Sequence, residues 1–292
     1  MEMQLVFNIS ISFVLFLIIG QSFSLTYYTA RFFHVAHAFT LTIAAYFLFF
    51  FYIQLQNPVW FSILLAIVCA TIIGILSELA LYKPLRRHNA TPMMLMIASL
   101  VLYIVLQNVI SILWSNNTQS VRTGGISVGY NFFGAFITDI QIITIVVCMA
   151  LFTSCVLLLK FSRIGRGIRA VASNSELSNV VGIHSNKVIL WAFAIGSALA
   201  AIAGILIAFD MGMNPMMGFN WLLCGIVVMI IGGVGSHWGL LGGALFLATA
   251  QHLAAYYIGS QWMDAVAYII LILFLIARPL GFSGKRLKKI EI

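Results

Sequence analysis

Residues 188–209 read VILWAFAIGSALAAIAGILIAF, without one charged side chain. A transmembrane helix needs about 20 predominantly apolar residues. Further apolar runs lie at about 5–27, 32–54, 58–82, 92–114, 139–160, 219–234, 238–258 and 262–278. These runs are continuous, whereas the strands of a membrane barrel alternate apolar and polar residues. The sequence therefore predicts an all-α, polytopic membrane protein with about eight or nine transmembrane helices.

Composition supports this fold class. Of the 292 residues, 62% are hydrophobic and 8% are charged, and the mean hydropathy is +1.08. Soluble domains carry about 25% charged residues, so a soluble enzyme, a disordered chain and a disulfide scaffold are excluded. The four cysteines are scattered within apolar runs, which indicates packing rather than a metal site. No room remains for a soluble domain, so residues 1–292 are expected to form a single transmembrane domain.

The basic residues predict the topology. With the N-terminus outside and nine spans, 14 of the 15 Lys and Arg residues become cytoplasmic, and Arg122 alone lies outside. Positive charge collects on the cytoplasmic side of membrane proteins, so the net charge of +8 reports topology and no nucleic-acid partner is expected. The N-terminus has no basic segment, so the first run is expected to be a retained span. The C-terminus is then cytoplasmic.

The boundaries between spans carry turn residues. The prolines are expected at span edges or in loops, and they are Pro58, Pro84, Pro92, Pro215 and Pro279. The glycine-rich stretch 232–239 joins two runs, and the segment 219–258 is either two tilted spans or one span and a re-entrant segment.

Two loops are longer than tight connections. The outer loop 115–138 is polar and contains Thr123-Gly124-Gly125, and it is either a lid or docking surface or a floppy connector. In the cytoplasmic loop 161–187, apolar residues at near-helical spacing predict one short amphipathic helix that ends at the C-cap glycine Gly182. These residues are Ile164, Ile168, Val171, Ala172 and Val180. Such a helix either anchors the loop to membrane lipid or docks onto a cytoplasmic partner.

Small residues repeat every four positions in two places, which favours close helix packing or, as the second interpretation, a pore lining. They are Ala192, Gly196, Ala200, Gly204 and Ala208, and then Gly235, Gly239 and Gly243.

Ionisable groups at membrane depth are costly and suggest function. His34, His37, Glu78 and His252 could relay protons or bind metal, or could make structural hydrogen bonds, with Glu78 pairing to Lys83 or Arg86. There is no phosphate-binding loop, no Ser-His-Asp or HExxH signature and no convincing metal-ligand spacing, so no catalytic residue, metal or cofactor is predicted.

Taken together, several motifs give the chain a family resemblance. They are Val35-Ala36-His37-Ala38, the stretch from Glu78 to Tyr82-Lys83-Pro84-Leu85-Arg86, Gly165-Arg166-Gly167-Ile168-Arg169-Ala170-Val171-Ala172 with Val181-Gly182-Ile183, Phe193-Ala194-Ile195-Gly196 to Ala203-Gly204, Gly232-Gly233-Val234-Gly235-Ser236 to Gly242-Gly243, and Arg278-Pro279-Leu280-Gly281. In combination they resemble bacterial ABC importer permeases of the branched-chain amino acid (Liv-type, binding-protein-dependent) family. Ala38 stands where the family usually has Gly, so the lining near His37 is expected to be tighter.

The resemblance implies a type II-like ABC importer permease core in the bacterial cytoplasmic membrane, with a short cytoplasmic coupling helix. It implies a second permease subunit, identical or homologous, two ATP-binding subunits that hydrolyse ATP, and an extracytoplasmic solute-binding protein. The implied coupling-loop residues are Gly165, Arg166, Gly167, Arg169, Ala170, Glu176, Gly182 and Ile183. Candidates for the translocation pathway or its packing are His37, Ala38, Glu78, Gly196, Gly204, Gly232, Gly233, Gly235 and Gly243.

The implied cargo is a small solute, with branched-chain amino acids first and urea or a short amide as the alternative. Two other classes stay open. One is a secondary transporter coupled to an ion through His37, Glu78 or His252, and the weaker one is a membrane enzyme.

Overall fold

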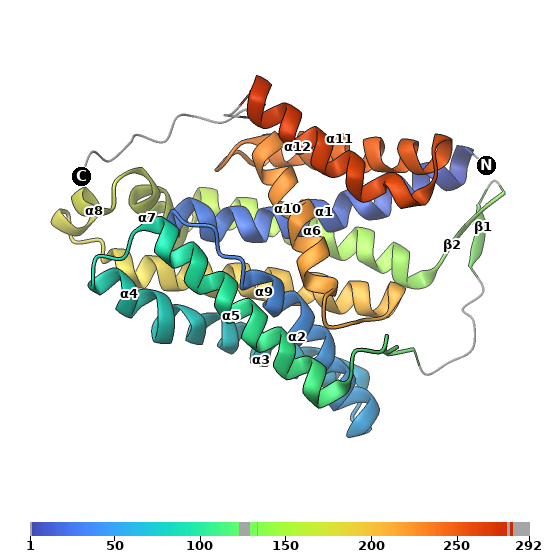
Figure 1. Cartoon of the computed structure of the whole chain (residues 1–292), viewed down its shortest axis with the longest axis horizontal. Coiled ribbons are helices and arrows are strands. Elements are labelled where there is room, and N and C mark those ends of the chain that lie inside the picture. The colour runs from blue at the N-terminus through green and yellow to red at the C-terminus, as the bar shows by residue number, and fades with distance from the viewer. Residues whose placement is uncertain (1, 123–128, 133, 279–280, 283–292) are drawn as a thin grey trace.

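The apolar runs of the sequence form helices, and one connection holds a small β-hairpin (Figure 1). The structure is a computed structural model that describes residues 2–122, 129–132, 134–278 and 281–282. The elements are α1 (Glu2–Ala30), α2 (His37–Phe49), η1 (Phe50–Gln54), α3 (Val59–Ser77), η2 (Glu78–Tyr82), α4 (Lys83–Arg87), α5 (Pro92–Trp114), β1 (Tyr130–Phe132), β2 (Ala135–Ile137), α6 (Asp139–Phe161), α7 (Arg163–Ser173), α8 (Ser175–Val180), α9 (Ser185–Met211), α10 (Met217–Gly232), α11 (His237–Tyr257), η3 (Ser260–Trp262) and α12 (Met263–Ala277). The predicted polytopic helical fold class is confirmed.

Helix α1 runs through the middle of the bundle and packs against α6, α9, α10 and α11 (Figure 1). Leu17, Ile18 and Phe23 have no exposed surface. A helix that is apolar on every side must be covered all round by protein or by lipid. The even hydrophobicity of the first run therefore fits its central position.

Among the described residues, seven helical stretches are long and apolar enough to cross a membrane. They are Glu2–Ala30, His37–Gln54, Val59–Arg87, Pro92–Trp114, Asp139–Phe161, Ser185–Met211 and Ser260–Ala277. The two other predicted runs form α10 and α11. Helix α10 has 16 residues, a length of about 24 Å at 1.5 Å per residue. Each predicted run is thus a helix, and the nine-span topology stays a prediction.

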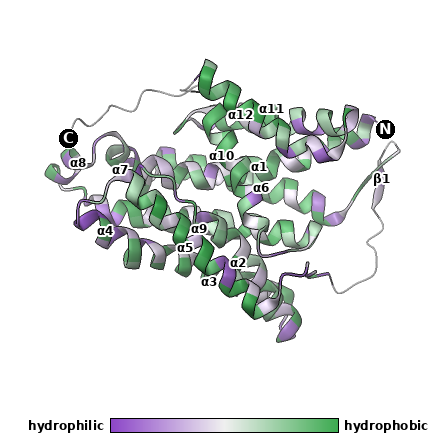
Figure 2. Ribbon diagram, in the orientation of Figure 1, coloured by the Kyte–Doolittle hydropathy of each residue, from purple (hydrophilic) through white to green (hydrophobic). Residues whose placement is uncertain are grey.

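Hydrophilic residues concentrate at the two ends of the bundle, with an apolar band between them (Figure 2). The sides of the band expose large apolar residues such as Leu64 and Val68 of α3, Val101 of α5 and Leu273 of α12. In water such surfaces would mark interaction sites or aggregation, whereas a bilayer covers them. The distribution supports a multi-pass membrane protein.

One proline departs from the prediction. Pro84 does not end a span, because α3, η2 and α4 form one continuous helical stretch from Val59 to Arg87. Proline lacks an N–H and its ring clashes with the carbonyl four residues earlier. The π-helical turn η2, at Glu78–Tyr82, ends two residues before the proline, and such turns are a recognised way to bend a helix around a disruption. Pro58 and Pro92 lie at helix starts as expected, and Pro279 lies outside the described residues.

The glycine-rich join is a tight turn between two helices that pack against each other. Helix α10 ends at Gly232, residues 233–236 form the turn, and α11 begins at His237. Gly233 and Gly235 have φ values of 91° and 80°, which glycine adopts without a steric penalty. Gly235 therefore belongs to the turn and not to the helical seam predicted for it with Gly239 and Gly243.

The outer loop is held against the bundle in its described part. Gln119 and Met213 exchange backbone hydrogen bonds of 2.8 and 2.9 Å. The β1–β2 hairpin is fixed to the start of α1, because Gln4 accepts a hydrogen bond from the backbone N–H of Phe136 at 2.9 Å. These contacts favour the lid or docking interpretation over a floppy connector. The predicted Thr123-Gly124-Gly125 stretch and the basic residues beyond position 282 lie outside the described residues.

Candidate functional site

Helix α7 is amphipathic and lies at one end of the bundle, next to α8 (Figure 1). It begins at Ser162, whose hydroxyl accepts a hydrogen bond from the backbone N–H of Gly165 at 2.9 Å, as serines at helix N-caps do. Its buried residues Ile168 and Val171 pack it against α1, α6 and α9, while Arg169 is exposed. The helix therefore touches three long helices and still presents a basic surface outward.

Helix α8 continues this surface and is tied down at both ends. The side-chain oxygen of Asn174 accepts hydrogen bonds from the backbone N–H groups of Glu176 and Leu177, both at 3.0 Å. The side-chain oxygen of Asn179 accepts bonds from the N–H and the hydroxyl of Ser185, again both at 3.0 Å. Helix α8 is thereby fixed between α7 and the start of α9, and we refer to α7 and α8 together as the α7–α8 hairpin.

The loop 161–187 differs from the prediction in two respects. It holds two helices, because the chain breaks at Asn174, which ends α7 and caps α8. Val180, expected on the buried face, is 81% exposed, and Leu177 beside it is 63% exposed. The predicted end at Gly182 is confirmed, since this glycine follows α8 with a φ of 87°.

The other predicted coupling-loop residues lie at different depths. Gly165 is buried, and a Cβ there would overlap the carbonyl oxygens of Leu158 and Leu159. Ile183 packs against the small apolar cluster of Phe32 and Tyr82. Gly167 and Ala170 are half-buried on α7, whereas Arg166, Glu176 and Gly182 are exposed with Arg169. The exposed residues lie on the surface of the α7–α8 hairpin that faces away from the bundle, and the glycines shape the contact between the hairpin and the bundle.

A buried polar cluster fixes the connection between α1 and α2 close to this hairpin. The Tyr82 hydroxyl and Nδ1 of His34 are hydrogen-bonded at 3.0 Å, and Nε2 of His37 and the Ser22 hydroxyl at 3.1 Å. A guanidinium nitrogen of Arg31 donates to the backbone carbonyl of Ala172 in α7. The cluster therefore connects the bundle core to the hairpin.

Glu78 lies in η2 with only 1% of its side chain exposed and forms an ion pair with Arg86. One guanidinium nitrogen donates to Oε2 at 3.2 Å, and a second donates to Oε1. A bidentate pair satisfies both carboxylate oxygens. The predicted partner Arg86 is confirmed, and Lys83 forms no ion pair within the described residues.

The small residues of α9 are contact points between helices. A Cβ on Gly204 would overlap the carbonyl oxygen of Leu41 in α2, and one on Gly196 would lie 3.0 Å from the carbonyl oxygen of Ser22 in α1 and 3.7 Å from Cε1 of His37. Ala38 is fully buried, and its carbonyl oxygen faces Gly218 of α10. These residues bring α1, α2, α9 and α10 into close contact.

The α10–α11 contact is equally close. A Cβ on Gly239 would overlap the carbonyl oxygen of Gly232, and one on Gly243 would lie 2.8 Å from the carbonyl oxygen of Val228. Among the predicted pathway residues, Gly235 lines a small cavity of about 50 Å³ beside Arg169 and His237. The other predicted pathway residues line neither this small cavity nor the larger cavity between α1, α6 and α9 to α12, so the packing interpretation fits their geometry.

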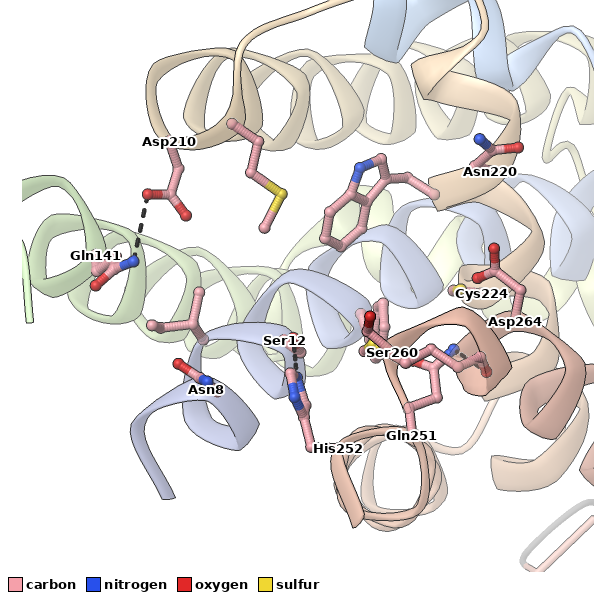
Figure 3. Close-up of a pocket in the computed structure, with 15 residues that line it drawn as sticks. Asn8, Ser12, Gln141, Asp210, Asn220, Cys224, Gln251, His252, Ser260 and Asp264 are labelled. Atoms are coloured by element: carbon pink, nitrogen blue, oxygen red, sulfur yellow. Dashed lines mark hydrogen bonds between the residues drawn. The ribbon is translucent and has the colours of Figure 1, made fainter. Parts of the chain in front are cut away.

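A larger cavity of about 520 Å³ lies between α1, α6, α9, α10, α11 and α12 (Figure 3). It is at the end of the bundle opposite the α7–α8 hairpin, since its lining includes the start of α6 and the end of α9. Figure 3 shows Asp210 and Gln141 on one side and Asp264, Gln251 and Ser260 on the other. We refer to it as the outer cavity.

His252 is the one predicted candidate in the outer cavity, and its Nε2 is hydrogen-bonded to the Ser12 hydroxyl at 2.7 Å. Sequence reasoning missed Asn8, Gln251 and Asn220. The available signal was position, because these polar residues lie in apolar helices near ends that the topology places outside.

Comparison with known proteins gives a match over most of the chain. Residues 5–275 match the family model described as branched-chain amino acid transport system, permease component. The chain is 32% identical over 225 residues to the high-affinity branched-chain amino acid transport system permease protein LivH of Escherichia coli K12, which covers 75% of this chain and 72% of that protein. It is also 32% identical to the high-affinity branched-chain amino acid transport system permease protein BraD of Pseudomonas aeruginosa, and the match covers 75% of this chain and 73% of BraD. The probable branched-chain amino acid transport permease protein LivH of Methanocaldococcus jannaschii is 28% identical, and the match covers 80% of this chain and 76% of that protein.

Proposed function

Because the chain belongs to the branched-chain amino acid transport permease family, we propose that it is the membrane-spanning permease of an ATP-driven importer of branched-chain amino acids. The observation that carries the proposal is the family match over residues 5–275, together with relatives whose names state this cargo. The apolar band of the bundle supports a place in the bacterial cytoplasmic membrane.

The proposed assembly contains two permease chains, identical or homologous, two ATP-binding subunits and an extracytoplasmic binding protein that delivers the solute. ATP hydrolysis belongs to the separate subunits. Residues 1–292 act as one transmembrane domain, with the N-terminus outside and the C-terminus in the cytoplasm. The distribution of Lys and Arg supports this orientation.

The α7–α8 hairpin is the proposed coupling surface for the ATP-binding subunits. Arg166, Arg169 and Glu176 supply polar contacts, and Leu177 and Val180 supply an exposed apolar patch. Gly165, Gly167, Ala170, Gly182 and Ile183 set the shape of the loop. Because α7 packs against α1, α6 and α9, movement of the hairpin is transmitted to long helices. Closure of the ATP-binding subunits would thus bias the bundle between two access states.

The predicted pathway residues are proposed as the packed contacts on which those helices move. Gly196, Gly204, Gly232 and Gly243 lie where two backbones approach closely. Such contacts tolerate little change in side-chain volume. Glu78 and His37, with Ala38, hold the end of the bundle next to the hairpin, and Gly233 and Gly235 form the turn between α10 and α11.

Reconstitution tests the proposed function. The permease pair is assembled in liposomes with its ATP-binding subunits, and uptake of labelled leucine is measured with the binding protein outside and ATP inside. We expect uptake that requires ATP and every partner. Transport by the permease alone under a pH gradient would instead indicate an ion-coupled transporter. Uptake of urea but not leucine would indicate the short-amide alternative.

Charge reversal tests the coupling surface. Arg169→Glu is expected to reduce co-purification of the ATP-binding subunits about tenfold, because an interface charge pair becomes a like-charge contact. Arg87→Glu is the matched control, since Arg87 is exposed at the same end of the bundle on α4. Equal co-purification of the two variants would contradict the contact assignment.

A further inference from the structure

We propose that the outer cavity is a subsite of the permease that binds the ammonium group of an amino acid through Asp264 and Gln251. The inference rests on the proposed function, because it concerns the cargo of the same transporter. It adds a location and a recognition chemistry within this chain, separate from the coupling hairpin.

The dimensions of the outer cavity suit a small zwitterion with an apolar side chain. Its volume of about 520 Å³ falls within the ~300–1,000 Å³ of typical small-molecule sites. Phe16, Trp221 and Met263 contribute to its lining, and the ring centroids of Phe16 and Trp221 are 5.7 Å apart. Aromatic and apolar walls with a few polar groups are the usual composition of a ligand site.

The charges of the lining favour a cation. The described lining contains two carboxylates, Asp210 and Asp264, and no Lys or Arg. Asp210 is already engaged by Arg122 at 3.5 Å and by the amide of Gln141 at 3.4 Å. Asp264 makes no hydrogen bond or ion pair within the described residues, so its carboxylate is available to a ligand.

Gln251 provides the independent observation. Its side chain is 2% exposed, and its Nε2 donates to the backbone carbonyl of Met263 at 3.0 Å. Its Oε1 is buried, belongs to a residue that lines the cavity, and accepts no hydrogen bond from the described residues. A buried acceptor without a partner is costly and requires an explanation. The group that would satisfy it is a hydrogen-bond donor inside the cavity.

An ammonium group satisfies both residues together. It carries three N–H donors and a positive charge, so one can reach Oε1 of Gln251 while the charge is balanced by Asp264. Gln251 is fixed to Met263, the residue directly before Asp264, which keeps the two acceptors on one side of the cavity (Figure 3). The amide of Asn220, on the neighbouring α10, offers a donor to the ligand's carboxylate.

Thiol protection tests the subsite directly. Ser260→Cys places a reporter in the cavity lining, where Ser260 is exposed. The complete complex of permeases and ATP-binding subunits, without binding protein, is placed in nanodiscs, and the rate of maleimide labelling at the reporter is measured. Four probes at equal millimolar concentration are compared. They are leucine, 3-methylbutylamine, which lacks the carboxylate, 4-methylpentanoate, which lacks the ammonium group, and sodium chloride.

We expect leucine and 3-methylbutylamine to slow labelling about tenfold, the effect of one charge-assisted contact, and the other two probes to leave it unchanged. Asp264→Asn should abolish the protection, and Asp139→Asn, at the start of α6 outside the cavity, should retain it. A reporter at Asn117→Cys on the outer loop should be labelled equally with and without leucine.

The proposal is overturned by an absence of leucine protection, by equal protection from 4-methylpentanoate or sodium, or by full protection in Asp264→Asn. Leucine uptake by the parent complex, measured in liposomes with binding protein and ATP, separates the two claims. Uptake without protection contradicts the subsite and leaves the proposed function standing. Absence of leucine uptake contradicts the proposed function itself.

Discussion

At the scale of single residues, the Glu78–Arg86 pair has a clear energetic role. Glu78 is 1% exposed and Arg86 is 20% exposed. A buried ion pair adds little over an apolar replacement, but removing one partner leaves an uncompensated charge. The pair therefore makes the end of the bundle next to the hairpin sensitive to single substitutions.

We predict that Arg86→Ala destabilises the protein by about 3–5 kcal/mol, because the Glu78 carboxylate loses its counter-ion. Glu78→Gln combined with Arg86→Ala should recover part of this loss, since the amide carries no charge. Thermal unfolding of the purified protein in detergent measures both effects. Arg87→Ala serves as the control, because Arg87 is exposed and makes no ion pair within the described residues. If the single and double variants unfold at the same temperature, the buried charge is not the cause.

Residue-scale features were only partly predictable. The sequence indicated Lys83 or Arg86 as a partner of Glu78, and in the structure the partner is Arg86. It could not indicate that His34 meets Tyr82 or that Gln251 keeps an unpaired oxygen, because these depend on contacts between helices far apart in the chain. Contacts within one helix can be inferred from spacing, whereas contacts between distant helices cannot. The outer cavity, which several distant helices line, is therefore apparent only in the structure.

At the scale of elements, helix boundaries were predicted from apolar runs, and capping residues account for two of them in the structure. Thr91 accepts a hydrogen bond from the N–H of Met94 and Thr138 forms a capping box with Gln141, which places the starts of α5 and α6 close to the predicted boundaries. Pro84 was misplaced because a proline signal alone does not reveal that a π-helical turn accommodates it. The break at Asn174 was missed because the helical spacing of apolar residues continues across it.

We predict that Gly204→Ala destabilises the contact between α9 and α2 by about 1–3 kcal/mol, the usual cost of overpacking. The added methyl group would overlap the carbonyl oxygen of Leu41. Gly242→Ala is the matched control, because a Cβ there meets no atom within 4 Å and alanine favours a helix by up to about 1 kcal/mol. The two variants should shift the unfolding temperature in opposite directions, and a shift of the same size and sign in both would contradict close packing at Gly204.

At the scale of the whole molecule, the structure relates the two ends of the bundle. The turn between α10 and α11 lies at the same end of the bundle as the α7–α8 hairpin, because Gly235 and His237 line a cavity together with Ile168 and Arg169 of α7. The outer cavity and the β-hairpin lie at the opposite end. If the hairpin is cytoplasmic, the turn is cytoplasmic as well, which supports two full spans over α10 and α11 against a re-entrant segment.

Labelling of intact cells tests this arrangement. Single thiols are introduced as Glu176→Cys on α8, Trp238→Cys at the start of α11 and Asn117→Cys on the outer loop, all at exposed positions. A membrane-impermeant maleimide is expected to label the Asn117→Cys variant at once and the other two only after permeabilisation. The parent protein, whose four cysteines are native, gives the background.

The three positions distinguish the ways in which the orientation can be wrong. Immediate labelling of Glu176→Cys would place the hairpin outside, beyond the reach of any cytoplasmic ATP-binding subunit, and the coupling proposal would be lost. Immediate labelling of Trp238→Cys alone would conflict with the structure, because α7 and the α10–α11 turn share one cavity. The expected pattern requires an odd number of crossings between Asn117 and Glu176 and an even number between Glu176 and Trp238. The helices α6 in the first interval and α9 and α10 in the second supply these crossings.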